Sequence, residues 1–120
     1  MDKKILLVDD AAFMRMLIRD TLTKAGYTQI LEAADGEIAV QTFDAESPEL
    51  VIMDITMPNK TGIEALKEIK AKHPTAKVIM CSAMGQEAMV VEAIRLGALD
   101  FIVKPFKADR ILQTVQKILG

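Results

Sequence analysis

Residues 5–10 have the sequence ILLVDD, in which four consecutive aliphatic side chains precede two aspartates. An apolar run without polar alternation is typical of a strand that is buried on both faces, as in a parallel sheet. The same pattern recurs in LVIMD at residues 50–54 and in VIMCS at residues 78–82. A shorter run, FIVK, occupies residues 101–104, and residues 29–33 form a weaker candidate. We therefore predict five strands.

Longer segments with a helical spacing of apolar residues separate these runs. Glycine is favoured just past a helix end, so Gly26 and Gly97 mark the ends of the first and fourth helices. The predicted helical segments are residues 13–25, a short one from 35, 63–72, 86–96 and a last one around 111–118. Regular alternation of strand and helix predicts right-handed crossovers and a parallel sheet. We expect an α/β fold, a three-layer sandwich in which five helices flank the sheet, in a single domain covering residues 1–120.

The composition excludes several classes of protein. The net charge of −2 gives no electrostatic footprint for nucleic acid, and the longest apolar runs of four residues are far short of the roughly 20 that a membrane span needs. The start of the chain has no basic and apolar leader, and the lone Cys81 is consistent with a reducing cytosol. We therefore expect a cytoplasmic protein that binds neither nucleic acid nor membrane.

Polar side chains follow four of the predicted strands, namely Asp9 and Asp10, Asp54, Ser82, and Lys104. Ligands of open α/β sheets bind outside the carboxyl ends of the strands, so we expect these side chains to meet at one edge. Two unit charges about 4 Å apart repel by roughly 4 kcal/mol at an effective dielectric near 20, so clustered carboxylates require a proton or a cation. Oxygen ligands without a Cys or His cluster favour Mg²⁺.

A cation, a lysine and a hydroxyl beside carboxylates suit phosphoryl transfer, because the loose transition state requires positioning and charge neutralisation. Asp54 is the best candidate nucleophile, since it follows the predicted central strand between the acidic pair and the Ser82–Lys104 side. Singly, each residue has an ordinary explanation: an aspartate pair can cap a helix, Asp54 and Ser82 can belong to turns, and Lys104 can be a solvated charge. Only their joint placement supports the prediction.

Four stretches together resemble the receiver domain of two-component response regulators and extend over almost the whole chain: LLVDDAAFMRMLI, DITMPNKTGIEAL, VIMCSAMG and EAIRLGALDFIVKPF. Within that family, the similarity is greatest to the single-domain regulators of chemotaxis. The resemblance implies a doubly wound, flavodoxin-like sheet with strand order 2-1-3-4-5, an order known from that branch of the family rather than worked out from this sequence.

The resemblance also implies a role for each site residue. Asp54 is then the phosphoacceptor, Asp10 binds Mg²⁺ directly, and Asp9 acts beside it, often through water. Thr56 offers its backbone carbonyl to the metal, and Lys104 pairs with the phosphoryl group. The remaining implied features are a switch hydroxyl on Ser82, an aromatic switch at Phe101 that turns inward, and a cis peptide between Lys104 and Pro105.

The implied function is a monomeric signalling switch that catalyses its own phosphorylation and dephosphorylation but does not turn over an external substrate. A CheA-like histidine kinase donates the phosphoryl group, the flagellar motor switch protein is the target, and a chemotaxis phosphatase is a possible further partner. Phosphorylation is expected to bias a face built from the fourth helix, the fifth strand and the fifth helix.

Two other classes of function stay open at this point. The first is a phosphorelay carrier, or a receiver domain of a two-component system outside chemotaxis. The second is an enzyme, either a phosphatase or a flavin protein. A phosphatase with an aspartate nucleophile needs a second acid two residues later, where this sequence has Thr56. Asp9 and Asp10 would repel a flavin phosphate, and no Gly/Ser/Thr-rich cradle follows the first strand.

Overall fold

Five parallel strands form one sheet in the order β2-β1-β3-β4-β5 in the computed structural model, which describes residues 3–120. The strands are β1 (Lys4–Val8), β2 (Gln29–Ala33), β3 (Leu50–Asp54), β4 (Val78–Ser82) and β5 (Asp100–Val103). The helices are α1 (Ala12–Lys24), α2 (Gly36–Glu46), α3 (Gly62–Lys72), α4 (Glu87–Arg95) and α5 (Ala108–Leu119). The expected elements, their alternation and the implied strand order are therefore confirmed.

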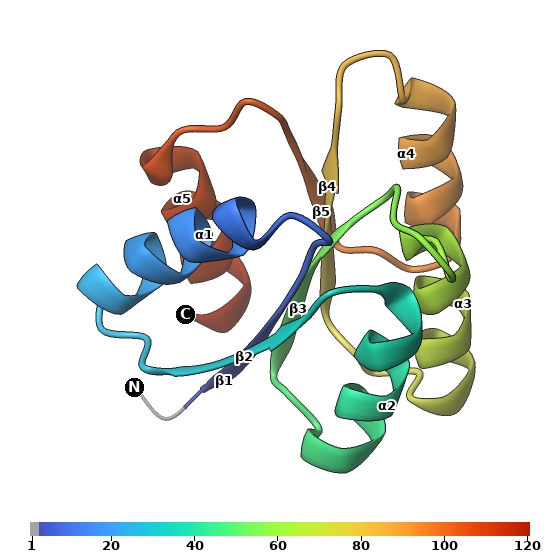
Figure 1. The fold of residues 1–120 in the computed structure, drawn as a ribbon, viewed down its shortest axis with the longest axis horizontal. Coiled ribbons are helices and arrows are strands. Elements are labelled where there is room, and N and C mark those ends of the chain that lie inside the picture. Colours follow the sequence, from blue (N-terminus) through green and yellow to red (C-terminus); the bar gives the residue numbers. More distant parts are fainter. Residues whose placement is uncertain (1–2) are drawn as a thin grey trace.

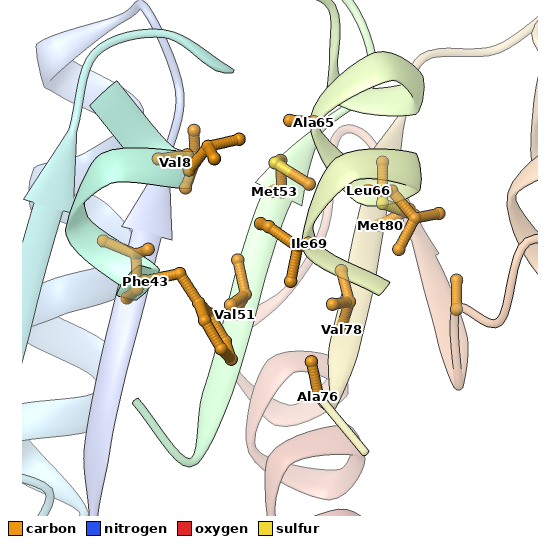
Figure 2. Packing of buried hydrophobic residues seen from close by; sticks show 14 of the residues in the cluster. Val8, Phe43, Val51, Met53, Ala65, Leu66, Ile69, Ala76, Val78 and Met80 are labelled. Atoms are coloured by element: carbon orange, nitrogen blue, oxygen red, sulfur yellow. The ribbon is translucent and has the colours of Figure 1, made fainter. Parts of the chain in front are cut away.

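The helices cover both faces of the sheet, with α1 and α5 on one side and α2, α3 and α4 on the other (Figure 1). Successive side chains of a strand point to opposite faces. Leu6 and Val8 accordingly belong to the core beneath α2 to α4, whereas Ile5 and Leu7 belong to the core beneath α1 and α5. Figure 2 shows the first of these cores, where side chains of β3 and β4 pack against α2 and α3: Val51, Met53, Val78, Met80, Phe43, Leu66 and Ile69.

The three inner strands and the two edge strands differ in burial. All five residues of β3 and of β4 are buried, as their unbroken apolar runs predict. On β5, at the edge of the sheet, only Ile102 is buried, and Phe101 and Val103 are exposed. The apolar run of β5 predicted burial on both faces, which is wrong for this strand, because an edge strand has one neighbour and α4 leaves part of it uncovered.

Polar side chains set where α2 and α3 begin. Asp35 accepts a hydrogen bond from the backbone N–H of Ile38 at 2.9 Å. At the start of α3, Thr61 and Glu64 form a reciprocal capping box, with hydrogen bonds of 3.0 and 3.2 Å. Such caps satisfy backbone donors that have no partner within the helix. They fix the ends of the loops that follow β2 and β3, at the edge of the sheet where all the parallel strands end.

Helix α1 departs from the burial that its sequence suggests. Its side chains Phe13, Met16 and Leu17 are exposed, and the buried positions are Ile18 and Leu22, which are one turn apart. The helix has more apolar residues than a single face can bury. Within residues 3–120, no helix is both long and apolar enough to cross a membrane.

Candidate functional site

An acidic pocket lies at the carboxyl edge of the sheet. Asp9 and Asp10 directly follow β1, and Asp54 is the last residue of the neighbouring strand β3. One carboxylate oxygen from each of these aspartates lies within 4.8 Å of the others. Asp9 and Asp54 are buried, whereas Asp10 is exposed to solvent. Asp10 and Asp54 are 44 positions apart in the sequence, and the structure brings them together at one edge of the sheet, as expected.

Lys104 extends into this pocket from the end of β5. Its Nζ atom lies 3.1 Å from Asp9 Oδ2 and 3.2 Å from Asp54 Oδ2, so it bridges two of the three aspartates. The backbone N–H of Lys104 donates to the carbonyl of Ser82 at 2.7 Å, which ties the residue to the end of β4. The Lys104–Pro105 peptide is cis, as the resemblance implied.

The electrostatics of the pocket favour a further cation. Burial raises the pKa of Asp54, and the Asp9 charge adds to this increase, while the Lys104 ammonium opposes it. Burial lowers the pKa of Lys104, but the two aspartates outweigh burial, and the pKa is raised overall. One ammonium thus faces three carboxylates, and the pocket keeps an excess of negative charge. Because two of the three carboxylates are buried, a bound cation stabilises this excess of charge.

The donor set of the pocket fits Mg²⁺. All three side chains offer carboxylate oxygens, which this hard cation prefers, and exposed Asp10 leaves one side open to water or to a phosphate. Thr56 lies in the loop after β3 with an exposed side chain, two residues beyond Asp54. Its position is compatible with the implied backbone ligand.

Tight backbone packing fixes the position of Asp54. The N–H of the next residue, Ile55, donates to the carbonyl of Cys81 at 3.1 Å, and the N–H of Gly62 donates to the carbonyl of Ile55 at 2.7 Å. A Cβ atom at Gly62 would collide with the backbone oxygen of Asp54. Glycine is therefore needed here for a close backbone approach. Backbone contacts with the start of α3 and with β4 therefore fix the position of Asp54.

Ser82 and Phe101, on the neighbouring strands β4 and β5, both line an apolar groove. Ser82 is the buried last residue of β4, one position beyond Cys81, which pairs with Asp54 in the sheet. Phe101 on β5 is 36% exposed, so it is not an ordinary core residue. A groove of about 600 Å³ between α4 and β5 is lined by both residues and by apolar side chains that include Met84, Val90, Ile94 and Val103. The Phe101 ring, for which the resemblance implies an inward turn, therefore borders this groove.

The structure adds one residue that the sequence did not single out. Gln86, at the start of α4, makes side-chain hydrogen bonds to Thr56 and to the backbone of Ala83. It therefore connects the loops that follow β3 and β4, on either side of the pocket. Glutamine carries no functional signal of its own in a sequence, and the contact depends on how the two loops fold.

A doubly wound α/β domain with a carboxylate cluster and a lysine at the strand ends has the features of a phosphoacceptor protein. Comparison with family models matches residues 5–116 to the response regulator receiver domain. The chain belongs to the response regulator receiver domain family. It is a receiver domain of the CheY type, a signalling switch that is activated by phosphorylation. Receiver domains bind Mg²⁺ in an acidic pocket, and Asp9, Asp10 and Asp54 form such a group here.

Curated relatives support this assignment over the full length of the chain. The sequence is 57% identical to chemotaxis protein CheY of Bacillus subtilis over 120 residues, which is all of both chains. It is 54% identical to chemotaxis protein CheY of Thermotoga maritima over 118 residues, 98% of each chain. The receiver domain of NtrX from Brucella abortus superimposes with a TM-score of 0.92 at 38% identity, covering 97% of this chain and 98% of that domain.

Proposed function

We propose that this chain is a response regulator in which Asp54 accepts a phosphoryl group from a histidine kinase with the aid of Mg²⁺. The observation that carries the proposal is the placement of the Asp54 carboxylate, buried beside Asp9 and Asp10 and 3.2 Å from the Lys104 ammonium. A carboxylate in this position can attack phosphorus, and the positive charge next to it can stabilise the transferred group.

In the transfer, an Asp54 carboxylate oxygen forms a bond to phosphorus while the bond from phosphorus to the donor nitrogen of the kinase breaks. The product is an acyl phosphate on Asp54 and a free histidine on the kinase. When bound, Mg²⁺ would neutralise charge at the phosphoryl oxygens, and Asp10, Asp9, Asp54 and the carbonyl of Thr56 would hold it. Water attack on the acyl phosphate reverses the modification, so the domain catalyses both steps on itself without turning over an external substrate.

Phosphorylation changes the charge that Lys104 and Ser82 face. A phosphoryl group adds about −1.5 to −2 charge and three strong acceptor oxygens. Lys104, already directed at Asp54, pairs with it, and the Ser82 hydroxyl moves toward it. Movement of Ser82 leaves room for Phe101 to turn into the groove next to α4, although Phe101 has no hydroxyl with which to form a hydrogen bond there. The surface of α4, β5 and α5 changes with it and is the face that partners recognise.

The chemotaxis role is supported by the sequence similarity, 57% and 54% identity over at least 98% of the chain, to two proteins named chemotaxis protein CheY. We assign the donor as a CheA-like histidine kinase, the target as the flagellar motor switch protein, and a chemotaxis phosphatase as a further partner. Residues 1–120 then act as one monomeric receiver domain in the cytoplasm, without a nucleic-acid or membrane partner.

The alternative is a receiver domain or phosphorelay carrier of another two-component system. That function would use the same pocket and differ only in the partners of the exposed face. An enzyme on an external substrate is disfavoured, because the position two residues after Asp54 is Thr56, which has no second carboxylate to act as acid or base.

Phosphotransfer from radiolabelled kinases tests the proposal. A CheA-type kinase is expected to lose its label to the wild-type chain within seconds in Mg²⁺, and Asp54→Asn should accept none. An unrelated histidine kinase should transfer label much more slowly. Equal transfer to Asp54→Asn would contradict the assignment of the phosphoacceptor, and faster transfer from the unrelated kinase would favour the alternative system. Pull-down of the flagellar motor switch protein only by the phosphorylated chain would support the chemotaxis role.

A further inference from the structure

Gln86 occupies a bridging position between the two loops that flank Asp54. Its Oε1 atom accepts a hydrogen bond from the backbone N–H of Ala83 at 2.6 Å, and its Nε2 atom donates to Thr56 Oγ1 at 2.9 Å. Ala83 directly follows the buried Ser82 at the end of β4. Thr56 lies two residues beyond Asp54. One amide side chain thus joins the loop after β4 to the loop after β3.

No other hydrogen bond within residues 3–120 connects these two loops. Ala83, Met84 and Gly85 are exposed, and a Cβ atom at Gly85 would meet nothing within 4 Å, so packing restrains this segment little. Gln86 is the residue at the N-terminal cap of α4, yet its side chain does not cap the helix. The side chain turns back toward the loops instead, which leaves the first N–H groups of α4 without a side-chain acceptor.

We propose that Gln86 is a positioning residue that holds the loop after β4 in its unphosphorylated conformation. This inference rests on the proposed function. A phosphoryl group on Asp54 attracts donors at the end of β4, namely the Ser82 hydroxyl and the N–H groups that follow it. The N–H of Ala83 is already engaged by Gln86, and the loop is tied to Thr56. The loop therefore moves toward the phosphoryl group only after these two hydrogen bonds break.

Because the bonds exist in one state and break in the other, Gln86 opposes the switch thermodynamically. A ligand that favours the switched state binds more tightly once the opposing interaction is removed. The net contribution of one hydrogen bond corresponds to roughly a five-fold change in an equilibrium constant. Gln86→Ala removes both hydrogen bonds, so it should tighten the binding of a phosphoryl analogue about 25-fold.

The test measures the dissociation constant of beryllofluoride, which adds to a carboxylate as a phosphoryl analogue, by calorimetry in saturating Mg²⁺. The chains compared are the wild type, Gln86→Ala, Thr56→Val, the double variant, and two controls. Gln41→Ala removes an exposed glutamine of α2 for which the structure shows no side-chain hydrogen bond, and Asp54→Asn removes the acceptor. The amide resonance of Ala83 reports directly on the lost hydrogen bond, and urea unfolding confirms that each variant is folded.

The expected result is binding about 25-fold tighter in Gln86→Ala than in the wild type, with no change in Gln41→Ala. The gain should be smaller in the Thr56→Val background, where one of the two hydrogen bonds is already absent. A role limited to loop stability would not produce a gain in affinity. Unchanged or weaker binding in Gln86→Ala, with normal Asp54-dependent binding in the wild type, would overturn the inference and leave the proposed function intact. Absence of binding in the wild type would overturn both.

Discussion

Replacing Gly62 by alanine should damage the fold and the pocket together. Gly62 is the first residue of α3, and a Cβ atom added there would collide with the backbone oxygen of Asp54 and would lie 2.9 Å from the Asp54 carbonyl carbon and the Ile55 Cα atom. All three contacted atoms belong to the backbone, so no flexible side chain can move aside. Either α3 or the end of β3 has to shift.

The cost follows from this overpacking. Extra methylene groups forced into well-packed sites cost about 1–3 kcal/mol, and alanine regains up to about 1 kcal/mol of helix propensity relative to glycine. The overlap with the Asp54 oxygen is severe and places the cost at the upper end of this range, so we expect a net loss of about 2 kcal/mol in the free energy of unfolding. Because a 1 Å misplacement of a reacting group can cost about 100-fold in rate, phosphorylation of Asp54 should slow by at least about ten-fold.

Gly36→Ala is the matched control. Gly36 is the first residue of α2, and its added Cβ would collide with the backbone oxygen of Lys60 rather than with Asp54 or Ile55. Urea unfolding gives the stability of both variants, and labelling by acetyl phosphate in Mg²⁺ gives the phosphorylation rate. Both variants should lose stability, and only Gly62→Ala should lose rate. Equal rates in the two folded variants, or a fully stable Gly62→Ala, would refute the reasoning that backbone contact with α3 positions Asp54.

Three further predictions concern charge and burial. Burial raises the pKa of Asp54 in the folded state, so its contribution to stability is present at low pH and is lost as pH rises from the ordinary value of 3.8 through the raised pKa. In EDTA, Asp54→Asn should therefore be more stable than the wild type at pH 7 but not at pH 3. Urea unfolding at both pH values checks this. Mg²⁺ should stabilise the wild type by about 2.7 kcal/mol at 100 times its dissociation constant, and Asp10→Asn should lose most of this gain in thermal unfolding. Burial raises the pKa of Cys81 to about 12, so iodoacetamide at pH 8 should label the thiol in urea and leave it unmodified in the folded protein, as mass spectrometry would show.

The sequence was sufficient to predict the pocket because the parallel direction of the strands decides where the residues that follow each strand lie. In a parallel sheet all carboxyl ends lie at one edge, so the polar residues that follow buried runs must gather there. Asp9, Asp10, Asp54 and Lys104 meet this condition, and their approach is visible in the ion pairs of Lys104 and the grouping of the carboxylates. No side-chain conformation had to be known for this step.

Features that depend on local cover and rotamers were not predictable in the same way. The apolar residues of β5 do not reveal that it is an edge strand, so the sequence does not predict the exposure of Phe101 and Val103. Phe13 and Met16 on α1 are as apolar as the buried Ile18, and only the way the helix lies on the sheet decides which of them contact it. The bridge of Gln86 requires two loops to fold close together, which spacing along the chain does not encode.

The central claim is that Asp54 accepts a phosphoryl group in a Mg²⁺-dependent reaction that the domain itself catalyses. Intact-protein mass after incubation with acetyl phosphate tests it most directly, with Asp54→Asn and an EDTA sample in parallel. The account predicts a gain of one phosphoryl group, about 80 Da, in the wild type with Mg²⁺ and no gain in either control. The same gain in Asp54→Asn, or an unmodified wild type under conditions where Mg²⁺ is shown to bind, would contradict it.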